Sequence, residues 1–255
     1  METTSSGART GRLAWQTAEV LAVRRETPRA ARVVLRPQHW RRHLPGQHVD
    51  VRLTAEDGYT AQRSYSLASP PEQEGSLEVV VERLADGEVS PFLVDELRAG
   101  DALELRGPVG RWFVWEDALG GPVQLVAGGS GVVPFLAMLA HHRAVGSAVP
   151  LRLLASARTA DDLIGADLLA APGPAATTTV TLTRGAPAGW SGPVGRVDAA
   201  LLAAHAVPPE QRPQVFVCGS HGFVETVTGA LVGLGHDPAR VKTERFGATG
   251  SRAGA

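Results

Sequence analysis

The chain has 255 residues, enough for one large domain or two domains of ordinary size. Hydrophobic residues make up 44% of the sequence and charged residues 20%, a balance that is typical of globular proteins and excludes a disordered or fibrous chain. The 25 Lys and Arg residues nearly match the 26 Asp and Glu residues, and the formal net charge is −1. The overall charge therefore gives no reason to expect nucleic acid or an anionic membrane as a partner.

Cys218 is the only cysteine, which excludes an intrachain disulfide and an iron–sulfur cluster held by four cysteines of these 255 residues. Residues 1–11 lack the apolar core of a secretory signal, and no segment reaches the roughly 18 consecutive apolar residues of a membrane span. We therefore expect a cytoplasmic protein. Residues 1–12 and 248–255 are small and polar, and we expect both to be flexible tails.

Short apolar runs rich in β-branched residues fill residues 13–118 and are separated by turn-forming clusters. This spacing predicts an antiparallel barrel or sandwich. One segment breaks the pattern, because Ser90 precedes a proline at a plausible first helical position and Gly100 lies where a helix would stop. We predict a short helix there.

Residues 119–247 have a different pattern, in which apolar strand-like runs alternate with longer segments rich in Ala and Leu. Such alternation is typical of βαβ units and a parallel sheet. We therefore divide the chain near residue 119. The predicted helices of this second part are Val133–Val145, Leu163–Ala171, Asp198–His205 and Phe223–Gly233.

The segment RSYSLAS begins at Arg63 in one of the predicted strands. Alternate side chains of a strand share a face, so Arg63 and Tyr65 would point towards the same ligand while Ser64 and Ser66 point the other way. A guanidinium pairs well with a phosphate, and a phenol ring stacks on a flat heterocycle. By itself the pattern is more typical of ordinary cross-strand partners on a surface strand.

A glycine-rich turn joins a predicted strand to the helix at Val133–Val145 and contains Gly129, Ser130, Gly131 and, at the helix start, Pro134. Backbone amides in such a turn approach a pyrophosphate closely, and the helix dipole favours the negative charge. Any tight connection of this kind favours glycine, however, and proline replaces the last glycine of the usual G-x-G-x-x-G pattern.

Two arginines, Arg158 and Arg184, follow later strands, and Ser156 lies just before the first of them. Carboxyl ends of parallel strands face the ligand crevice, so both guanidiniums are candidates to hold the 2′-phosphate of NADPH. The competing interpretation is that Arg158 pairs with Asp161 or Asp162. The adjacent His141 and His142 do not have metal-ligand spacing, and we interpret them as solvated helix surface.

Together these segments resemble the ferredoxin reductase-like superfamily. RSYSLAS is similar to its R-x-Y-S-x-x-S flavin signature, and three further segments follow the family order: PGQ at 45–47, GEVS at 87–90 and GPVGRWF at 107–113. Gly129, Gly131 and Pro134 match its G-x-G-x-x-P nicotinamide pattern. Residues 218–223 (CGSHGF) resemble its C-G-P-x-x-F motif with Ser220 in place of proline, and residues 244–246 (ERF) resemble its closing strand.

The resemblance implies a two-domain fold. An antiparallel Greek-key β-barrel that binds FAD would occupy residues 13–118, and an α/β Rossmann-like parallel-sheet domain that binds NAD(P) would occupy residues 119–247. In the family, the residue at Arg63 contacts the FAD pyrophosphate, that at Tyr65 packs on the isoalloxazine, and that at Ser66 lies near the flavin N5. The remaining implied FAD contacts are Leu67, Gly87, Val89 and Ser90.

The resemblance also implies catalytic positions in the second domain. Cys218 would lie near the nicotinamide, Gly219 would let that ring approach, and Phe246 would cover the flavin until nicotinamide displaces it. Tyr65, Ser66, Cys218 and Phe246 are thus the predicted catalytic residues, and the glycine turn with Ser156, Arg158 and Arg184 is the predicted nicotinamide cofactor site. The two arginines favour NADPH over NADH.

The implied activity is that of an FAD-containing NAD(P)H-dependent oxidoreductase. We expect a monomeric reductase component that moves electrons through FAD to a separate redox partner protein, such as a ferredoxin or an oxygenase, with no nucleic acid or membrane partner. Two alternatives stay open. One is a reductase of diffusible acceptors such as free flavin or ferric chelates, and the other is a non-catalytic flavoprotein redox sensor.

Overall fold

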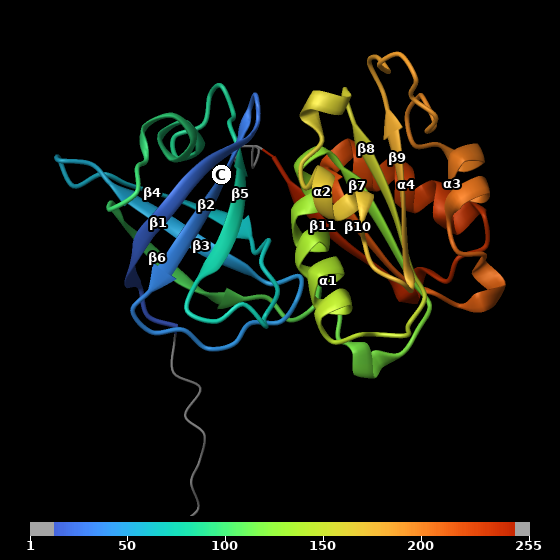
Figure 1. Ribbon diagram of the computed structural model, residues 1–255, viewed down its shortest axis with the longest axis horizontal. Helices are drawn as coiled ribbons and strands as arrows, with labels where there is room; N and C mark the ends of the chain where they lie inside the picture. Colours follow the sequence, from blue (N-terminus) through green and yellow to red (C-terminus); the bar gives the residue numbers. More distant parts are fainter. Residues whose placement is uncertain (1–12, 248–255) are drawn as a thin grey trace, which may run out of the picture.

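The computed structural model describes residues 13–247, which form two β-sheets side by side (Figure 1). The first sheet contains β1–β6 and the second contains β7–β11, in chain order. The two predicted tails, 1–12 and 248–255, lie outside the described residues. The domain limits 13–118 and 119–247 stay predictions.

The first sheet is antiparallel, with strand order β4-β3-β6-β1-β2-β5. A bridge between Leu67 and Val79 joins the two edge strands, β4 and β5, and closes the sheet into a barrel. The predicted antiparallel barrel is therefore confirmed. Its strands are β1 (Gln16–Thr27), β2 (Ala30–Pro37), β3 (His48–Thr54), β4 (Thr60–Ser66), β5 (Leu77–Glu82) and β6 (Ala102–Val109).

The predicted helix after Ser90 is shorter than expected. Helical structure begins at Ser90 and continues as a π-helix, η1 (Phe92–Glu96), which ends at Leu97 because that residue takes an extended conformation. Gly100 does not end the helix. It lies in a turn after it, where its amide donates to the Val20 carbonyl and its φ is +94°. The prediction missed this second turn, which leads directly into β6.

The second sheet is parallel throughout, with strand order β11-β10-β7-β8-β9. The predicted Rossmann-like parallel sheet is confirmed. Its strands are β7 (Val123–Gly128), β8 (Leu151–Ala157), β9 (Ala176–Leu182), β10 (Gln214–Ser220) and β11 (Val241–Phe246), and its α-helices are α1 (Val133–Ala144), α2 (Ala166–Ala170), α3 (Ala199–His205) and α4 (His221–Gly233).

The helices begin and end close to the predicted limits, with one exception. Helix α2 is shorter than predicted, because Gly165 takes a left-handed conformation with φ +74° and the chain before it forms a separate 3-10 turn, Ala160–Asp162. Asp198 caps α3 by accepting from the Leu201 amide at 2.8 Å. Among residues 13–247, no helix has the length and apolar character needed to cross a membrane.

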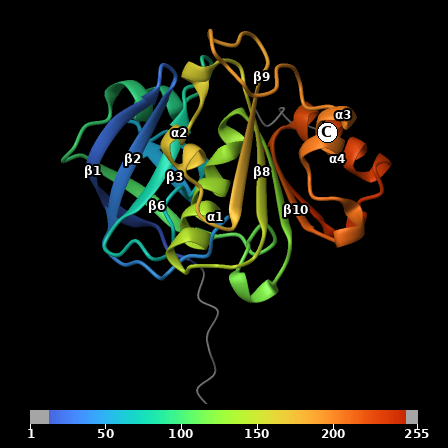
Figure 2. The same cartoon turned by 45° about the vertical axis from the view of Figure 1, so that its right-hand side comes forward.

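Alternate residues of the parallel strands enter two different cores. In β10, Phe216 and Cys218 face α1, whereas Val215 and Val217 face α4. Figure 2 shows the result: α1 and α2 lie between the parallel sheet and the barrel, and α3 and α4 cover the opposite face. The sheet is therefore buried on both sides, as parallel sheets generally are.

The core on the α1 side extends into the barrel. Ala30, Ala68 and Val80 of the barrel belong to the same buried cluster as Phe135 and Leu136 of α1. A continuous apolar core therefore fixes the two sheets relative to each other, and ligand-binding residues from both can contribute to one site.

His141 and His142 are buried in the interface between barrel and α1, so the interpretation as solvated helix surface was wrong. Both lie beside the Trp115 ring, with ring centroids 5.7 Å away in each case. His141 Nδ1 lies 3.0 Å from the Glu72 carboxylate, and His142 Nε2 lies 2.8 Å from the Val149 carbonyl. The interface explains the difference, because the pattern of α1 alone does not reveal that the barrel covers its last turns. No metal-binding group occurs among the described residues.

Candidate functional site

The flavin-motif residues lie on β4, at the edge of the sheet where the barrel closes. Arg63 is about half exposed, and its Nη2 donates to Glu88 Oε2 at 2.6 Å. Tyr65 packs partly buried against the barrel core. Burial raises the pKa of Tyr65, so its phenol stays protonated at physiological pH. The neutral Tyr65 ring is suited to stack on a flat heterocycle, and the exposed Arg63 guanidinium is suited to pair with a diphosphate, as predicted for FAD.

The opposite face of β4 anchors the strand. Ser64 Oγ donates to Asp50 Oδ1 of β3 at 2.6 Å, and Arg106 of β6 donates to Asp50 Oδ2 at 2.6 Å. The Arg106 contact and the Ser64 hydroxyl lower the pKa of Asp50 against the effect of its burial. The Ser64 hydrogen bond therefore ties the strand that carries Arg63 and Tyr65 to β3, and the ion pair ties β3 to β6.

Three of the predicted FAD contacts have side chains that are used within the protein. Leu67 and Val89 are fully buried in the barrel core. Ser90 is 5% exposed, and its Oγ accepts from the Leu84 amide at 3.0 Å. A Cβ on Gly87 would lie 2.7 Å from the same Oγ, so only glycine fits this turn. Gly87 and Ser90 thus shape the turn before η1, Leu67 and Val89 pack in the barrel core, and the contacts of these residues with FAD stay predictions.

The glycine-rich turn packs directly on β10. A Cβ added to Gly131 would lie 2.3 Å from the Cys218 carbonyl oxygen and 2.8 Å from the Gly219 amide nitrogen. Gly129 has φ +57° and open space in front of it, and Pro134 lies in the first turn of α1. The structure thus brings together two predicted motifs separated by about 90 residues in the chain. They meet through backbone atoms, with no side chain between Gly131 and the Cys218–Gly219 backbone.

Phe223 was not among the predicted site residues, although it is the last residue of the CGSHGF motif. Its ring lies 2.8 Å from the position of a Cβ on Gly128 and 2.5 Å from that of a Cβ on Gly219. Glycine at both positions is therefore needed for Phe223 to cover the two strand ends. The spacing of glycines before an aromatic residue is the signal that was available in the sequence.

Ser220, which stands where the family pattern has proline, is the N-cap of α4. Its Oγ accepts from the Phe223 amide at 3.4 Å, and its φ of −62° is the value that proline would take. The turn therefore keeps a proline-compatible shape, and serine adds a cap.

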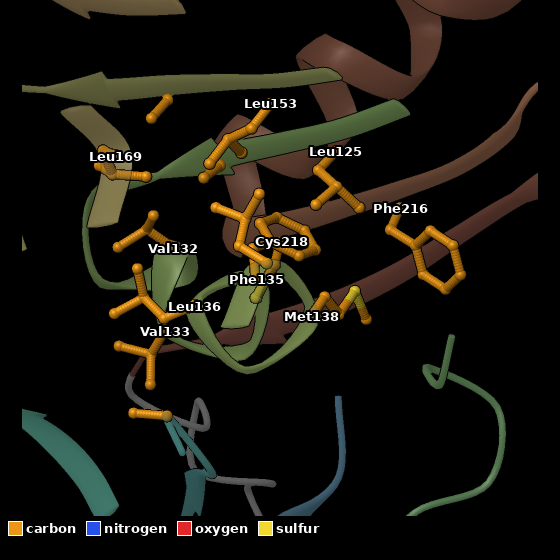
Figure 3. Close-up of a cluster of buried hydrophobic side chains, with 14 of the residues drawn as sticks. Leu125, Val132, Val133, Phe135, Leu136, Met138, Leu153, Leu169, Phe216 and Cys218 are labelled. Carbon is orange, nitrogen blue, oxygen red and sulfur yellow. The ribbon is translucent and has the colours of Figure 1, made fainter. Parts of the chain in front are cut away.

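The Cys218 thiol lies in the apolar cluster between the sheet and α1 (Figure 3). Burial raises the pKa of Cys218 well above its ordinary value, and the Glu244 carboxylate raises it further. The thiol is therefore protonated and does not supply a nucleophile. Its backbone carbonyl, in contrast, lies at the glycine turn.

Glu244 and His48 form a polar contact between the two sheets that we did not predict. Glu244 is the neighbour of Cys218 in the β10–β11 pairing, and its Oε1 lies 3.8 Å from His48 Nδ1 on β3. His48 pairs with Ser66 of the flavin motif across β3 and β4. The four residues therefore form a chain from the barrel motif to the Cys218 motif.

The Glu244 carboxyl is in an unusual environment. Burial raises its pKa to about 7, and its Oε2 is a buried atom without a hydrogen-bond partner among the described residues. Burial also lowers the pKa of His48. The sequence signal for Glu244 was an acidic residue two positions before Phe246 on a strand, which places both on one face.

Phe246 ends β11, opposite Ser220 of β10, and is 37% exposed. Its strand end is the one at which Glu244 approaches His48 of the barrel. The ring is thus at the carboxyl edge of the parallel sheet, close to the remaining motifs, as the resemblance implies. Its covering role stays a prediction.

Arg158 and Arg184 are adjacent, since the Arg184 amide donates to the Arg158 carbonyl at 2.9 Å, and both side chains are exposed. Asp162 instead lies 3.8 Å from Arg29 of the barrel and accepts from Thr159. Within residues 13–247, no ion pair joins Arg158 to Asp161 or Asp162. Ser156, half-buried, lies at the end of β8 just before these arginines.

The glycine-rich turn before α1 and the end of β10 together form a backbone surface, here called the cradle, that suits a dinucleotide and a flat ring system. Gly129 offers open space, Gly131 and Gly219 bring two backbones into contact, and Glu244 supplies an unpartnered buried carboxyl oxygen nearby. Side chains at the glycine positions would fill this cradle. The arrangement fits a nicotinamide cofactor bound at the strand ends of the parallel sheet and a flavin held by the barrel.

Comparisons with known proteins agree with this division. Residues 22–114 match the family model described as an oxidoreductase FAD-binding domain, and residues 125–229 match that of an oxidoreductase NAD-binding domain. The glycine betaine monooxygenase reductase subunit of Chromohalobacter salexigens is 32% identical over 80% of this chain and 56% of its own length. The toluate 1,2-dioxygenase electron transfer component of Pseudomonas putida is 28% identical over 81% of this chain and 59% of its own length.

Solved structures show the same architecture. The flavohem-like FAD/NAD-binding domain of nitric oxide dioxygenase from Vibrio cholerae is 26% identical, with a TM-score of 0.81 over 93% of this chain and 100% of that one. The Amycolatopsis cytochrome P450 reductase GcoB is 27% identical, with a TM-score of 0.80 over 94% of this chain and 73% of that one. The chain spans about half the length of the curated relatives named above.

Proposed function

Because the chain belongs to the ferredoxin reductase-like family of FAD- and NAD-binding oxidoreductases, we propose that it is a reductase component serving a separate redox partner protein. Electrons would pass from NADPH or NADH through FAD to a ferredoxin or to an oxygenase. The observation that carries the proposal is the contact between His48 and Glu244, which lies between the strand pair of the flavin motif and the strand pair of Cys218. A flavin and a nicotinamide held by these two strand pairs would therefore lie close to each other.

Bound FAD supplies the redox chemistry, because it accepts a hydride from a reduced nicotinamide and passes the electrons on. The protein contributes positioning. Arg63 would hold the FAD diphosphate, Tyr65 would pack on the flavin ring, and Gly219 would let the nicotinamide ring lie against it. Phe246 would exclude water from the ring face until the nicotinamide takes its place.

We propose NADPH as the preferred donor. Arg158 and Arg184 support this, because they place two exposed guanidiniums at adjacent strand ends and neither has a carboxylate partner among the ion pairs of residues 13–247. A 2′-phosphate would accept hydrogen bonds from both. The absence of an acidic residue at the β8 end supports the same preference, since such a residue typically binds the ribose hydroxyls of NADH.

A protein acceptor is supported by the names of the relatives, which are a monooxygenase reductase subunit and a dioxygenase electron transfer component. Cys218 is the only cysteine of the 255 residues, so these residues hold no four-cysteine iron–sulfur cluster. We propose that the partner protein provides the next redox centre. We propose that the reductase itself is monomeric and cytoplasmic.

Anaerobic mixing of the purified flavoprotein with NADPH and then with NADH tests the proposal. We expect the yellow flavin absorbance to bleach with both, and faster with NADPH. Turnover should then require an added protein acceptor and fall as salt is raised. Rapid reduction of free riboflavin without a partner would favour a reductase of diffusible acceptors instead. Failure of either nicotinamide to bleach bound FAD would favour a sensor.

A further inference from the structure

Arg63, the cation of the flavin motif, is already paired within the protein. Its Nη2 donates to Glu88 Oε2 at 2.6 Å, and its Nη1 donates to the Gln62 carbonyl at 2.7 Å. The other oxygen of Glu88, Oε1, accepts from the Tyr59 hydroxyl at 2.6 Å. Glu88 is thus held from two sides, facing the guanidinium that the proposed function assigns to the FAD diphosphate.

The position of Glu88 in the fold makes this pair unusual. Arg63 lies on β4 and Glu88 lies in the loop between β5 and η1, and β4 and β5 are the two edge strands of the barrel. The pair therefore spans the seam where the barrel closes. Tyr59 immediately precedes the strand that carries Arg63, and it is 57% exposed and donates to Glu88.

The pair contributes little to holding the seam closed. Both side chains are 49% exposed, and ion pairs of such exposure are worth little in solution. The backbone bridge between Leu67 and Val79 already joins the two edges, and the Leu67 side chain beside it is fully buried. Stability alone therefore gives no reason for a carboxylate at this position.

The carboxylate is ionised at neutral pH. The Tyr59 hydroxyl and the Arg63 guanidinium both hold the pKa of Glu88 below its ordinary value. A negative group at this point competes with a diphosphate in two ways. It occupies guanidinium donors that a phosphate would use, and it repels the phosphate charge.

We propose that Glu88 competes with the FAD diphosphate for Arg63 and thereby sets how readily the protein releases FAD. The inference rests on the proposed function, since it takes Arg63 as the diphosphate ligand. Binding FAD requires Arg63 to exchange its carboxylate partner for phosphate. Release of FAD is assisted because Glu88 recaptures the guanidinium as the phosphate leaves.

The test is the rate at which the holoprotein releases FAD after dilution, followed by the fluorescence of free FAD. In Glu88→Gln the amide keeps the size of the side chain but loses its charge, and we expect release to slow about three- to fivefold. Tyr59→Phe removes the second hydrogen bond to Glu88 and should slow release less. Faster release from Glu88→Gln would mean that Glu88 supports Arg63 and would overturn the proposal, as would an unchanged rate.

Two further variants separate the pair from a general effect of charge. Asp86→Asn removes an exposed carboxylate from the same loop and should leave the release rate unchanged. An equal slowing in Asp86→Asn would assign the effect to net charge and overturn the proposal. In an Arg63→Ala background, which should release FAD at least tenfold faster than wild type, adding Glu88→Gln should have no effect.

The outcomes also distinguish this inference from the proposed function. A wild-type protein that holds no FAD would contradict the proposed function itself. A wild-type protein that holds FAD and is bleached by NADPH, together with a Glu88→Gln variant that releases FAD at the wild-type rate, would overturn only the competition between Glu88 and the diphosphate.

Discussion

The surroundings of Glu244 change the chemistry of its carboxyl group. It ends up with 28% of its side chain exposed, near His48 and beside Cys218, and burial raises its pKa to about 7. No arginine or lysine offsets the charge, because none forms an ion pair with it among the described residues. Near neutral pH the carboxyl therefore exchanges a proton at the point where barrel and parallel sheet meet.

This raised pKa predicts a dependence of stability on pH. Below pH 4.5, the ordinary pKa of a glutamate, the carboxyl is protonated in both the folded and the unfolded chain. Folding then buries no charge at this position, so stability is not reduced. As pH rises from 4.5 to about 7, the unfolded chain loses the proton while the folded protein keeps it, so the free energy of unfolding falls. Above pH 7 the loss is complete.

Glu244→Gln should remove that loss. We expect the variant to match wild type at about pH 4 and to be more stable by about 2 kcal/mol at about pH 8, a value below the full conversion because a quarter of the side chain reaches solvent. Urea unfolding at both pH values measures the difference. Glu225→Gln, which alters an exposed partner of Arg245, is the control and should show no such gain. A constant difference across pH would contradict the prediction.

The proposed preference for NADPH also depends on individual residues, because it depends on the charges of Arg158 and Arg184. Replacing either with alanine should raise the KM for NADPH about tenfold or more and leave the KM for NADH nearly unchanged, since only NADPH carries the 2′-phosphate. Steady-state kinetics with both donors measures this. Arg196→Ala, another exposed arginine of the second domain, is the control. Equal increases for both donors would contradict the assignment.

At the scale of elements, the turn before α1 and the end of β10 act as one unit. Gly131 lies against the backbone of Cys218 and Gly219, and Phe223 covers Gly128 and Gly219 from α4. Backbone atoms cannot rotate away from an added side chain. The close approach of these two elements therefore depends on glycine.

Gly131→Ala should destabilise the protein by about 1–3 kcal/mol and weaken nicotinamide cofactor binding, because the new Cβ would force the turn away from Cys218. Chemical unfolding and cofactor titration measure the two effects. Gly229→Ala in α4, where a Cβ meets nothing within 4 Å, should instead stabilise the protein by up to about 1 kcal/mol. A Gly131→Ala variant as stable as wild type would show that the turn adapts.

At the scale of the whole molecule, polar contacts supplement the shared core between the two sheets. Glu26 of the barrel accepts from the Gly165 amide at 2.8 Å before α2, and it also accepts from Arg32 at 2.6 Å. Glu72 contacts His141 of α1 at 3.0 Å. These contacts hold the nicotinamide domain in a fixed position on the barrel, as hydride transfer between two bound rings requires.

Glu26→Ala should cost about 2–3 kcal/mol of stability, because it removes one of the two carboxylates that pair with Arg32 and leaves the Gly165 amide without its acceptor in a largely buried place. Urea unfolding measures the cost, and faster amide exchange at Gly165 would locate it in the interface. Glu19→Ala, which breaks an exposed pair with Arg36, should cost less than about 1 kcal/mol. Equal costs for the two variants would mean that the interface does not depend on Glu26.

The sequence by itself determined the two sheets and their types, because strand alternation and the βαβ pattern are local properties of the chain. It also located the motif residues on β4, on the turn before α1 and at the end of β10, because these segments together resemble the motifs of a known family in the same order. The start of α3 was predicted correctly at Asp198, which caps it, whereas the end of η1 was missed, because the chain leaves the helix at Leu97 and not at Gly100.

Only the tertiary structure decided which residues meet across the seam of the barrel and across its interface with the parallel sheet. The burial of His141 and His142, the contact of His48 with Glu244 and the pairing of Arg63 with Glu88 all join segments that are distant in sequence. The local sequence pattern carries no information about such pairs, because the burial and the pKa of a residue depend on which other elements pack against it. The seam of the barrel and its interface with the parallel sheet, where these pairs lie, exist only in the folded chain.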